Sequence, residues 1–137
     1  MSPENAESSD HATALVVVDH GSRNEAANRV VEELAADLRR QTGTRFVAVE
    51  PAHMELAQPD LGAAVEACQR AGAQKIVVAP FFLAPGRHST RDIPAMAAEQ
   101  ARRYPDLEIL VASPLGNDPL MTELILARAA AALDAGS

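Results

Sequence analysis

The sequence predicts one α/β domain with a doubly wound, four-stranded parallel sheet and helices on both faces. Four short β-branched or apolar runs alternate with four helical patterns, which is typical of βα units with right-handed crossovers. The third run is apolar almost throughout, as in a strand covered on both faces, and 137 residues suffice for one domain. We expect a disordered tail over 1–12, the domain over 13–134 and a C-terminal tail over 135–137.

The first unit combines a strand over 14–18 with a helix that begins near Ser22. Ser22 and Glu25 have the spacing of a capping box, and Gly43 fits a C-terminal cap. His20 lies between the strand and the helix. The apolar stripe expected to face the sheet comprises Ala27, Val30, Val31, Leu34, Ala35 and Leu38.

The second unit is a strand over 46–50 followed by a helix whose apolar stripe ends at the single cysteine of the chain, Cys68. Gly72 follows as a C-terminal cap. A lone cysteine cannot form an internal disulfide, and nothing near it in the sequence would activate the thiol. We therefore expect Cys68 to be a buried core residue. The stripe comprises Leu61, Ala64, Val65 and Cys68.

The last two strands are expected over 75–83 and 107–112. Each is followed by a helix with a recognisable start. Asp92 precedes the first of these helices, and Asp118 followed by Pro119 opens the second.

The composition excludes several classes of function. Twelve Lys and Arg against 19 Asp and Glu give a formal net charge of -7, which disfavours binding to nucleic acid or anionic membranes. Aromatic residues make up 3% of the chain, too few for a base-stacking platform. No apolar run approaches the ~20 residues that span a bilayer, and the polar N-terminal residues do not resemble a signal peptide. With one cysteine, these features predict a soluble cytoplasmic protein.

Three histidines follow three successive strands of the predicted sheet: His20, His53 and His88. Doubly wound sheets bind ligands at the carboxyl ends of their strands, so this clustering favours a site, although a histidine in such a place is often a solvated or capping side chain. Glu55 adds a carboxylate to the same edge. Two imidazoles and a carboxylate suit Fe²⁺, Co²⁺, Ni²⁺ or Zn²⁺ bound with open positions.

Three motifs together resemble the short sirohydrochlorin chelatases, which are class II tetrapyrrole chelatases that do not use ATP. The motifs are DHGSR at 19–23 followed by Asn28, EPAHMELAQP at 50–59 and PFFLAPGRHSTRDIP at 80–94, and PLG at 114–116 also matches. The resemblance spans most of the chain. It implies insertion of a divalent metal into sirohydrochlorin, with Fe²⁺ and siroheme the first expectation. The alternatives are Co²⁺ insertion for cobalamin, Ni²⁺ insertion, or a metal or tetrapyrrole carrier without turnover.

The resemblance also implies roles for individual residues. His20, Glu55 and His88 would bind the metal, and one of the two histidines would accept pyrrole protons. His53 would either hold the metal-binding residues in place or stabilise the fold. The substrate expected from the family carries many carboxylates, whereas the chain is acidic, so positive charge must be local. The residues expected to bind the substrate are Ser22, Arg23, Arg87 and Arg91.

Some features depart from related proteins. Gln58 stands where the family often has glutamate, which could weaken metal capture. Some plant members carry a cysteine-rich extension that binds an iron–sulfur cluster; this chain ends ALDAGS at 132–137, so no cluster is expected. The sequence contains no P-loop, and no ATP is expected. Histidine phosphatases also place a histidine after the first strand, but with arginine before it, where Asp19 would repel phosphate.

The macrocycle is large for one edge of a domain of this size. Long members of the family supply two such lobes in one chain. We therefore expect a homodimer whose two carboxyl edges face each other.

Overall fold

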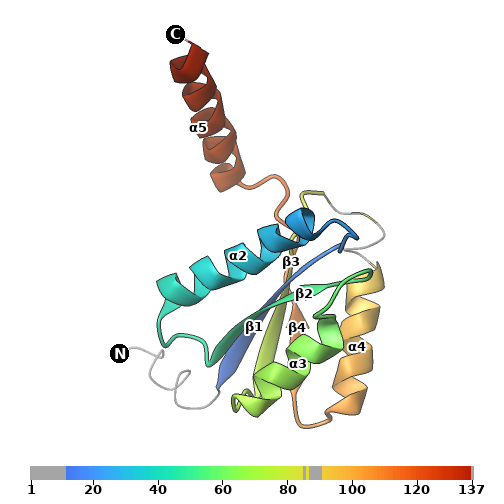
Figure 1. Ribbon diagram of the computed structural model, residues 1–137. Helices are drawn as coiled ribbons and strands as arrows, with labels where there is room; N and C mark the ends of the chain where they lie inside the picture. The colour runs from blue at the N-terminus through green and yellow to red at the C-terminus, as the bar shows by residue number, and fades with distance from the viewer. Residues whose placement is uncertain (1–11, 85, 87–90, 137) are drawn as a thin grey trace.

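A four-stranded parallel sheet forms the centre of this computed structural model, which describes residues 12–84, 86 and 91–136 (Figure 1). The expected tail over 1–12 lies almost entirely outside these residues. The spatial order is β2-β1-β3-β4, which requires crossovers between parallel neighbours and confirms the predicted fold class. The strands are β1 (Thr13–Asp19), β2 (Ala48–His53), β3 (Lys75–Pro80) and β4 (Glu108–Val111).

Helices cover the two faces of the sheet unequally. One face is covered by α2 (Glu25–Thr42), which packs on β1 and β2, while α3 (Leu61–Arg70) and α4 (Ile93–Arg103) cover the other face (Figure 1). The last helix, α5 (Pro119–Gly136), leads away from the sheet, and none of its residues is buried. Asp118 caps α5 as predicted, because its carboxylate accepts a hydrogen bond from the backbone N–H of Leu120 at 2.9 Å.

The main core lies between the sheet and the helix pair α3 and α4. It is built mainly from Val, Ile, Leu and Ala, since aromatic residues are scarce. Cys68 belongs to this core with no exposed surface, which confirms the expected buried thiol. Burial raises the pKa of Cys68 to about 12, and the negative charge of Glu50 adds to the effect. The buried members of the core are Ala14, Val16, Val18, Ala52, Leu61, Ala64, Val65, Cys68, Ala73, Ile76, Val78, Ile93 and Leu107.

The second strand differs from the prediction of 46–50. It runs from Ala48 to His53 and pairs in parallel with β1, where Val17 faces Pro51 and Asp19 faces His53. Pro51 lacks an N–H donor, but β2 lies at the edge of the sheet, where proline is tolerated. His53 is therefore the last residue of a strand and not a loop residue.

The start of α2 also differs from the prediction. The N-cap is Asn24, whose side chain accepts a hydrogen bond from the N–H of Ala26 at 2.9 Å, so the predicted capping box at Ser22 is wrong. The Ser22 hydroxyl instead accepts a bond from the N–H of Asn24 at 3.0 Å. Val30 was expected to face the sheet but is 51% exposed, because α2 covers only part of this face.

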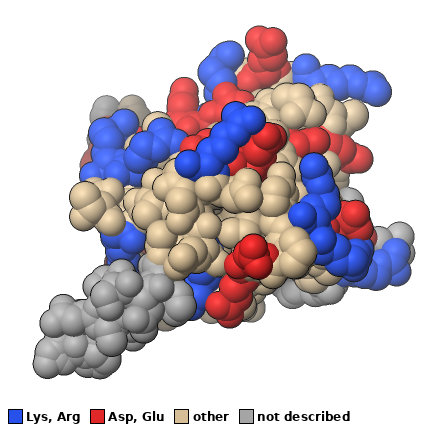
Figure 2. Space-filling model, turned by 90° about the horizontal axis from the view of Figure 1, so that it is seen from below, with Lys and Arg blue, Asp and Glu red and all other residues tan. Residues whose placement is uncertain are grey.

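The edge formed by the amino ends of the strands carries positive and negative side chains interspersed with uncharged ones (Figure 2). This edge is opposite to the one at which His20 and His53 lie. None of the described helices combines the length and the apolar character needed to cross a bilayer.

Candidate active site

His20 and Glu55 form a pair at the carboxyl edge of the sheet. His20 directly follows β1, Glu55 follows β2, and the His20 Nε2 atom lies 3.1 Å from the Glu55 Oε2 atom. The two side chains are 45% and 58% exposed. Phe82, in the segment after β3, meets the His20 ring edge-on, with a centroid distance of 6.4 Å. The pair thus offers a nitrogen and an oxygen donor that solvent and ligands can reach.

The backbone holds the loops that carry this pair against each other. The N–H of Met54 donates to the carbonyl of Asp19 at 2.9 Å, and the N–H of Glu55 donates to the carbonyl of His20 at 3.2 Å. Gly21 has a φ of 93°, and a Cβ atom at this position would lie 1.9 Å from the carbonyl oxygen of Glu55. Only glycine fits this contact without moving the two loops apart.

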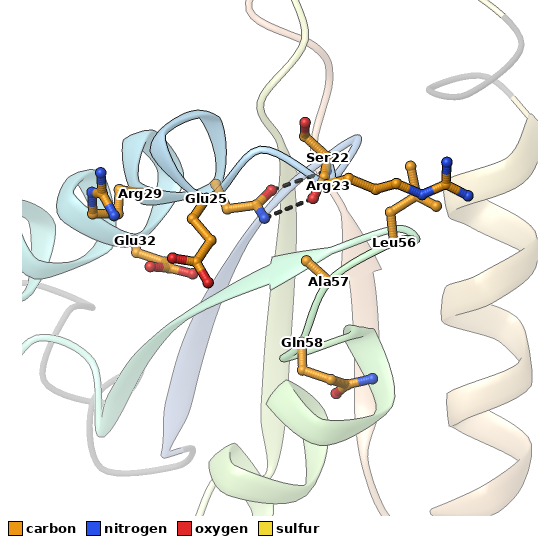
Figure 3. Close-up of a pocket in the computed structure, with 9 residues that line it drawn as sticks. Ser22, Arg23, Glu25, Arg29, Glu32, Leu56, Ala57 and Gln58 are labelled. Carbon is orange, nitrogen blue, oxygen red and sulfur yellow. Dashed lines mark hydrogen bonds between the residues drawn. The ribbon is translucent and has the colours of Figure 1, made fainter.

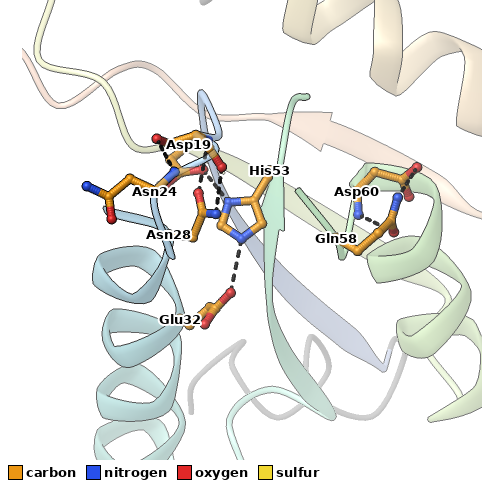
Figure 4. A network of polar contacts seen from close by, with 8 residues as sticks. Asp19, Asn24, Asn28, Glu32, His53, Gln58 and Asp60 are labelled. Carbon is orange, nitrogen blue, oxygen red and sulfur yellow. Dashed lines mark hydrogen bonds and ion pairs between the residues drawn. The ribbon is translucent and has the colours of Figure 1, made fainter. Parts of the chain in front are cut away.

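His53, the last residue of β2, is fully buried. Figure 4 shows its ring between the side chains of Asp19 and Glu32. Its Nδ1 atom is 2.7 Å from the Asp19 carboxylate, and its Nε2 atom is 3.1 Å from the carboxylate of Glu32 on α2. Both ring nitrogens are therefore engaged. His53 could coordinate a metal only after breaking one of these contacts, so its position fits the supporting role expected from the sequence.

Asn28 fixes the loop after β1. Its side-chain oxygen accepts a bond from the N–H of Ser22 at 2.9 Å, and its amide nitrogen donates to the carbonyl of Ser22 at 2.8 Å. Asn28 is a buried polar residue on α2, and these two bonds satisfy its amide. The loop from His20 to Ser22 is thus held from β2 on one side and from α2 on the other.

A cavity of about 490 Å³ lies beside this loop (Figure 3). Two arginines and two glutamates bring both signs of charge to its wall, and the Arg23 side chain extends past Leu56. Leu56 has a φ of 70°, which is uncommon for a residue with a side chain and marks a sharp bend after Glu55. The cavity is lined by Ser22, Arg23, Glu25, Asn28, Arg29, Glu32, Leu56, Ala57 and Gln58.

Gln58 connects this cavity to the start of α3. Its side-chain oxygen accepts a hydrogen bond from the N–H of Asp60 at 3.1 Å. Asp60 is the N-cap of α3 and accepts a bond from the N–H of Ala63 at 2.9 Å. Gln58 therefore braces a helix start as well as lining the cavity.

Two of the predicted site residues, Arg87 and His88, lie outside the described residues. Arg91 is described at the start of α4, 72% exposed, with its Nε atom 3.8 Å from the Asp92 carboxylate. Within 12–84, 86 and 91–136, no three His, Cys, Asp or Glu side chains are grouped so that they could hold a metal ion. The structure brings together His20 and Glu55, and the whole set of metal ligands stays a prediction.

Sequence reasoning did not find roles for Asn28 and Glu32. A signal existed for Asn28, which interrupts the apolar stripe of α2 as a polar residue one turn before Val31 and Glu32. Glu32 gave no such signal, because an acidic residue on a helix is ordinarily a solvated side chain.

The family model CbiX matches residues 14–132. The chain belongs to the CbiX family. A chloroplastic sirohydrochlorin ferrochelatase from Arabidopsis thaliana is 40% identical over 114 residues, which are 83% of this chain and 50% of that protein. A sirohydrochlorin cobaltochelatase from Methanopyrus kandleri is 36% identical over 140 residues, covering 88% of this chain and 96% of that protein.

The chain is also similar to a solved structure of SirB from Bacillus subtilis with Fe³⁺. It superposes with a TM-score of 0.77 at 28% identity, covering 85% of this chain and 45% of SirB. This CbiX chain thus spans about half the length of the Arabidopsis protein and of SirB, and nearly all of the Methanopyrus protein. The resemblance to the sirohydrochlorin chelatases that the motifs predicted is confirmed.

Proposed function

We propose that this CbiX protein inserts a divalent metal ion into sirohydrochlorin without ATP. The observation that carries the proposal is the exposed pair of His20 and Glu55 at the carboxyl edge of the sheet. The Arabidopsis and Methanopyrus relatives are named for this class of reaction, one as a ferrochelatase and the other as a cobaltochelatase.

Insertion exchanges two pyrrole protons for one metal ion, so the site must hold the ion, help it lose water and accept protons. A neutral imidazole can coordinate the ion or accept a proton near pH 7. In our proposal His20 coordinates the incoming ion, and Glu55, whose Oε2 atom lies 3.1 Å from the His20 Nε2 atom, offsets the charge of the ion. An open site with few protein ligands leaves coordination positions on the ion for water and for the macrocycle nitrogens. The ion is transferred to these nitrogens at the end of the reaction.

His88 completes the ligand set in this proposal and shares proton uptake with His20. Ser22, Arg23, Arg87 and Arg91 bind the carboxylates of the macrocycle. Support comes from the cavity beside His20, whose wall includes Ser22 and Arg23, and from the exposure of Arg91. Arginine suits this task because its guanidinium can bind a carboxylate through two parallel hydrogen bonds.

We further propose that the active form is a cytoplasmic homodimer with two carboxyl edges facing each other. The match to this chain covers 50% of the Arabidopsis relative and 45% of SirB. A second copy would provide the other wall around a macrocycle that exceeds one sheet edge.

The physiological metal is proposed to be Fe²⁺, followed by Co²⁺ and Ni²⁺. The three ions share a preference for imidazole and carboxylate ligands, so the donor set alone does not separate them. The iron proposal rests on the likeness of the HMEL segment at 53–56 and the PFFLAPGRH segment at 80–88 to ferrochelatases.

An anaerobic insertion assay with the three ions tests the proposal. Sirohydrochlorin absorbance is followed with protein held far below the substrate concentration. We expect many turnovers per chain, with the highest kcat/KM for Fe²⁺. A higher value for Co²⁺ or Ni²⁺ would replace the metal and leave the reaction class intact. A yield no greater than the protein concentration would contradict catalysis and indicate a carrier.

A further inference from the structure

The helix α5 is apolar on all sides. Among its 18 residues only Glu123, Arg128 and Asp134 are charged, and none is buried. At roughly 100° per residue, Leu120 and Leu124 point to one side, while Leu126 and Leu133 point to nearly the opposite one. Leu120, Leu126 and Leu133 are 71%, 64% and 76% exposed. A helix with apolar residues all round is normally buried on more than one side.

A matching apolar strip lies on the sheet face that α2 covers. One row of residues crosses this face in register, from β2 through β1 and β3 to β4: Val49, Leu15, Val77 and Leu110. Exposure rises along the row, from 1% for Val49 through half-buried Leu15 and Val77 to 44% for Leu110. Across the described residues, α2 covers β1 and β2 but not β3 and β4. We call the part over Val77 and Leu110 the open strip.

If α5 packed on the open strip of its own chain, only one side of the helix would be buried. The segment before α5 is also tied to its own sheet, since the N–H of Ala112 donates to Val78 and that of Leu115 donates to Phe82, both at 2.9 Å. From there α5 starts at the carboxyl edge and leads away from the sheet (Figure 1). This is the direction in which the second sheet lies when two carboxyl edges face each other.

We infer that two copies of this chain exchange α5, so that α5 of each copy packs on the open strip of the other. The other side of α5, which carries Leu120 and Leu124, then lies at the carboxyl edge. A cavity of about 450 Å³ at this edge is lined by Leu115, Leu120, Met121 and Leu124, among others. A helix of 18 residues is about 27 Å long. Two such helices buried on two sides cover on the order of 2,000 Å², which is the size of a stable dimer interface.

The exchange rests on the proposed homodimer but not on the proposed reaction. It gives the two edges a fixed mutual orientation and encloses the space in front of His20 and Glu55. Both apolar surfaces are removed from solvent by the same contact.

Light scattering on a variant with Leu126→Glu and Leu133→Glu tests the role of α5. We expect the dimer dissociation constant to rise about 100-fold or more, because four buried leucines per dimer are lost. The matched control is Val47→Glu, at an apolar position 43% exposed near the amino edge, which should leave the dimer intact. A dimer unchanged by the double substitution would overturn the inference.

Cross-linking distinguishes exchange from closure within one chain. A tagged Leu110→Cys chain is co-expressed with an untagged Leu126→Cys chain and treated with a short bismaleimide; Cys68 is buried in both. Exchange predicts covalent dimers that join residue 110 of one chain to residue 126 of the other. A chain carrying both substitutions that cross-links only to itself would overturn exchange and leave the homodimer standing. A strictly monomeric wild type would overturn both, whatever the insertion activity.

Discussion

His20 directly follows β1 and His53 ends the neighbouring strand β2, yet their surroundings are opposite. His20 is 45% exposed and contacts the exposed carboxylate of Glu55, whereas His53 is fully buried between Asp19 and Glu32. Two histidines at the same edge of the sheet thus differ in whether a ligand can reach them. Packing, and not residue type, decides which histidine can reach a ligand.

A single position along the chain causes this difference. Asp19 and His53 are partners in the register of β1 and β2, and both side chains lie toward α2. His20 comes one residue after the end of β1, where the turn at Gly21 leads the chain out of the sheet. His53, which lies under α2, is therefore buried, whereas His20, which follows the end of β1, is exposed to solvent.

The strongest test of this comparison is His20→Ala. We expect the insertion rate to fall about 100-fold or more, since a metal donor and proton acceptor is removed. Stability should change by less than about 0.5 kcal/mol, because the side chain is half-exposed. Steady-state insertion and urea unfolding measure the two effects. Unchanged turnover would remove His20 from the site.

His53→Ala should show the reverse pattern. It leaves Asp19 and Glu32 without the imidazole between them and opens a cavity, so we expect a loss of about 2–3 kcal/mol in the free energy of unfolding. Urea unfolding of both histidine variants under one condition gives the comparison directly. If His53→Ala instead folds normally and loses metal affinity, the enclosed histidine is a ligand and the comparison fails.

Glu55→Gln sharpens the exposed half of the comparison. The amide keeps the shape of the side chain but removes its charge, and we expect about a tenfold lower kcat/KM for the metal. The KM for sirohydrochlorin should change less. Glu66→Gln, at an exposed carboxylate on α3, serves as the matched control. Equal effects of the two substitutions would mean that Glu55 acts only through general charge.

The smallest effect concerns the other enclosed titratable group, Cys68. Its thiol keeps its proton up to about pH 12 when folded, whereas the ordinary pKa is 9.0. Between these values the unfolded chain binds fewer protons than the folded one, so stability falls as pH rises. We expect a loss of roughly 1 kcal/mol between pH 8 and pH 10 that Cys68→Ala removes. Parallel slopes in the two proteins would contradict this.

Much of the fold could be predicted from local sequence. The Val-rich run before Asp19, the cap at Asp118 and the stripe ending in Cys68 each specify an element through its immediate neighbours. The end of β2 could not be predicted in this way, because Pro51 argues against a strand unless that strand is known to lie at a sheet edge. Edge position is a property of the whole sheet.

The site residues likewise differ in whether local sequence predicts them. His20 and Glu55 could be found from the sequence, since each directly follows a strand and both were expected at one edge. The contacts of His53 with Asp19 and Glu32 join β2, β1 and α2, and no local pattern reports such a convergence. The exposure of α5 was also unpredictable, because an apolar helix after a strand ordinarily packs on its own sheet.

Because Gly21 has no side chain, the loop after β1 lies directly against the Glu55 carbonyl in the loop after β2. The bond from the N–H of Glu55 to the carbonyl of His20 holds the two residues together at this close approach, so capturing an ion requires little ordering of this part of the chain. In a library with position 21 fully randomised, selection for metal insertion should return glycine almost alone.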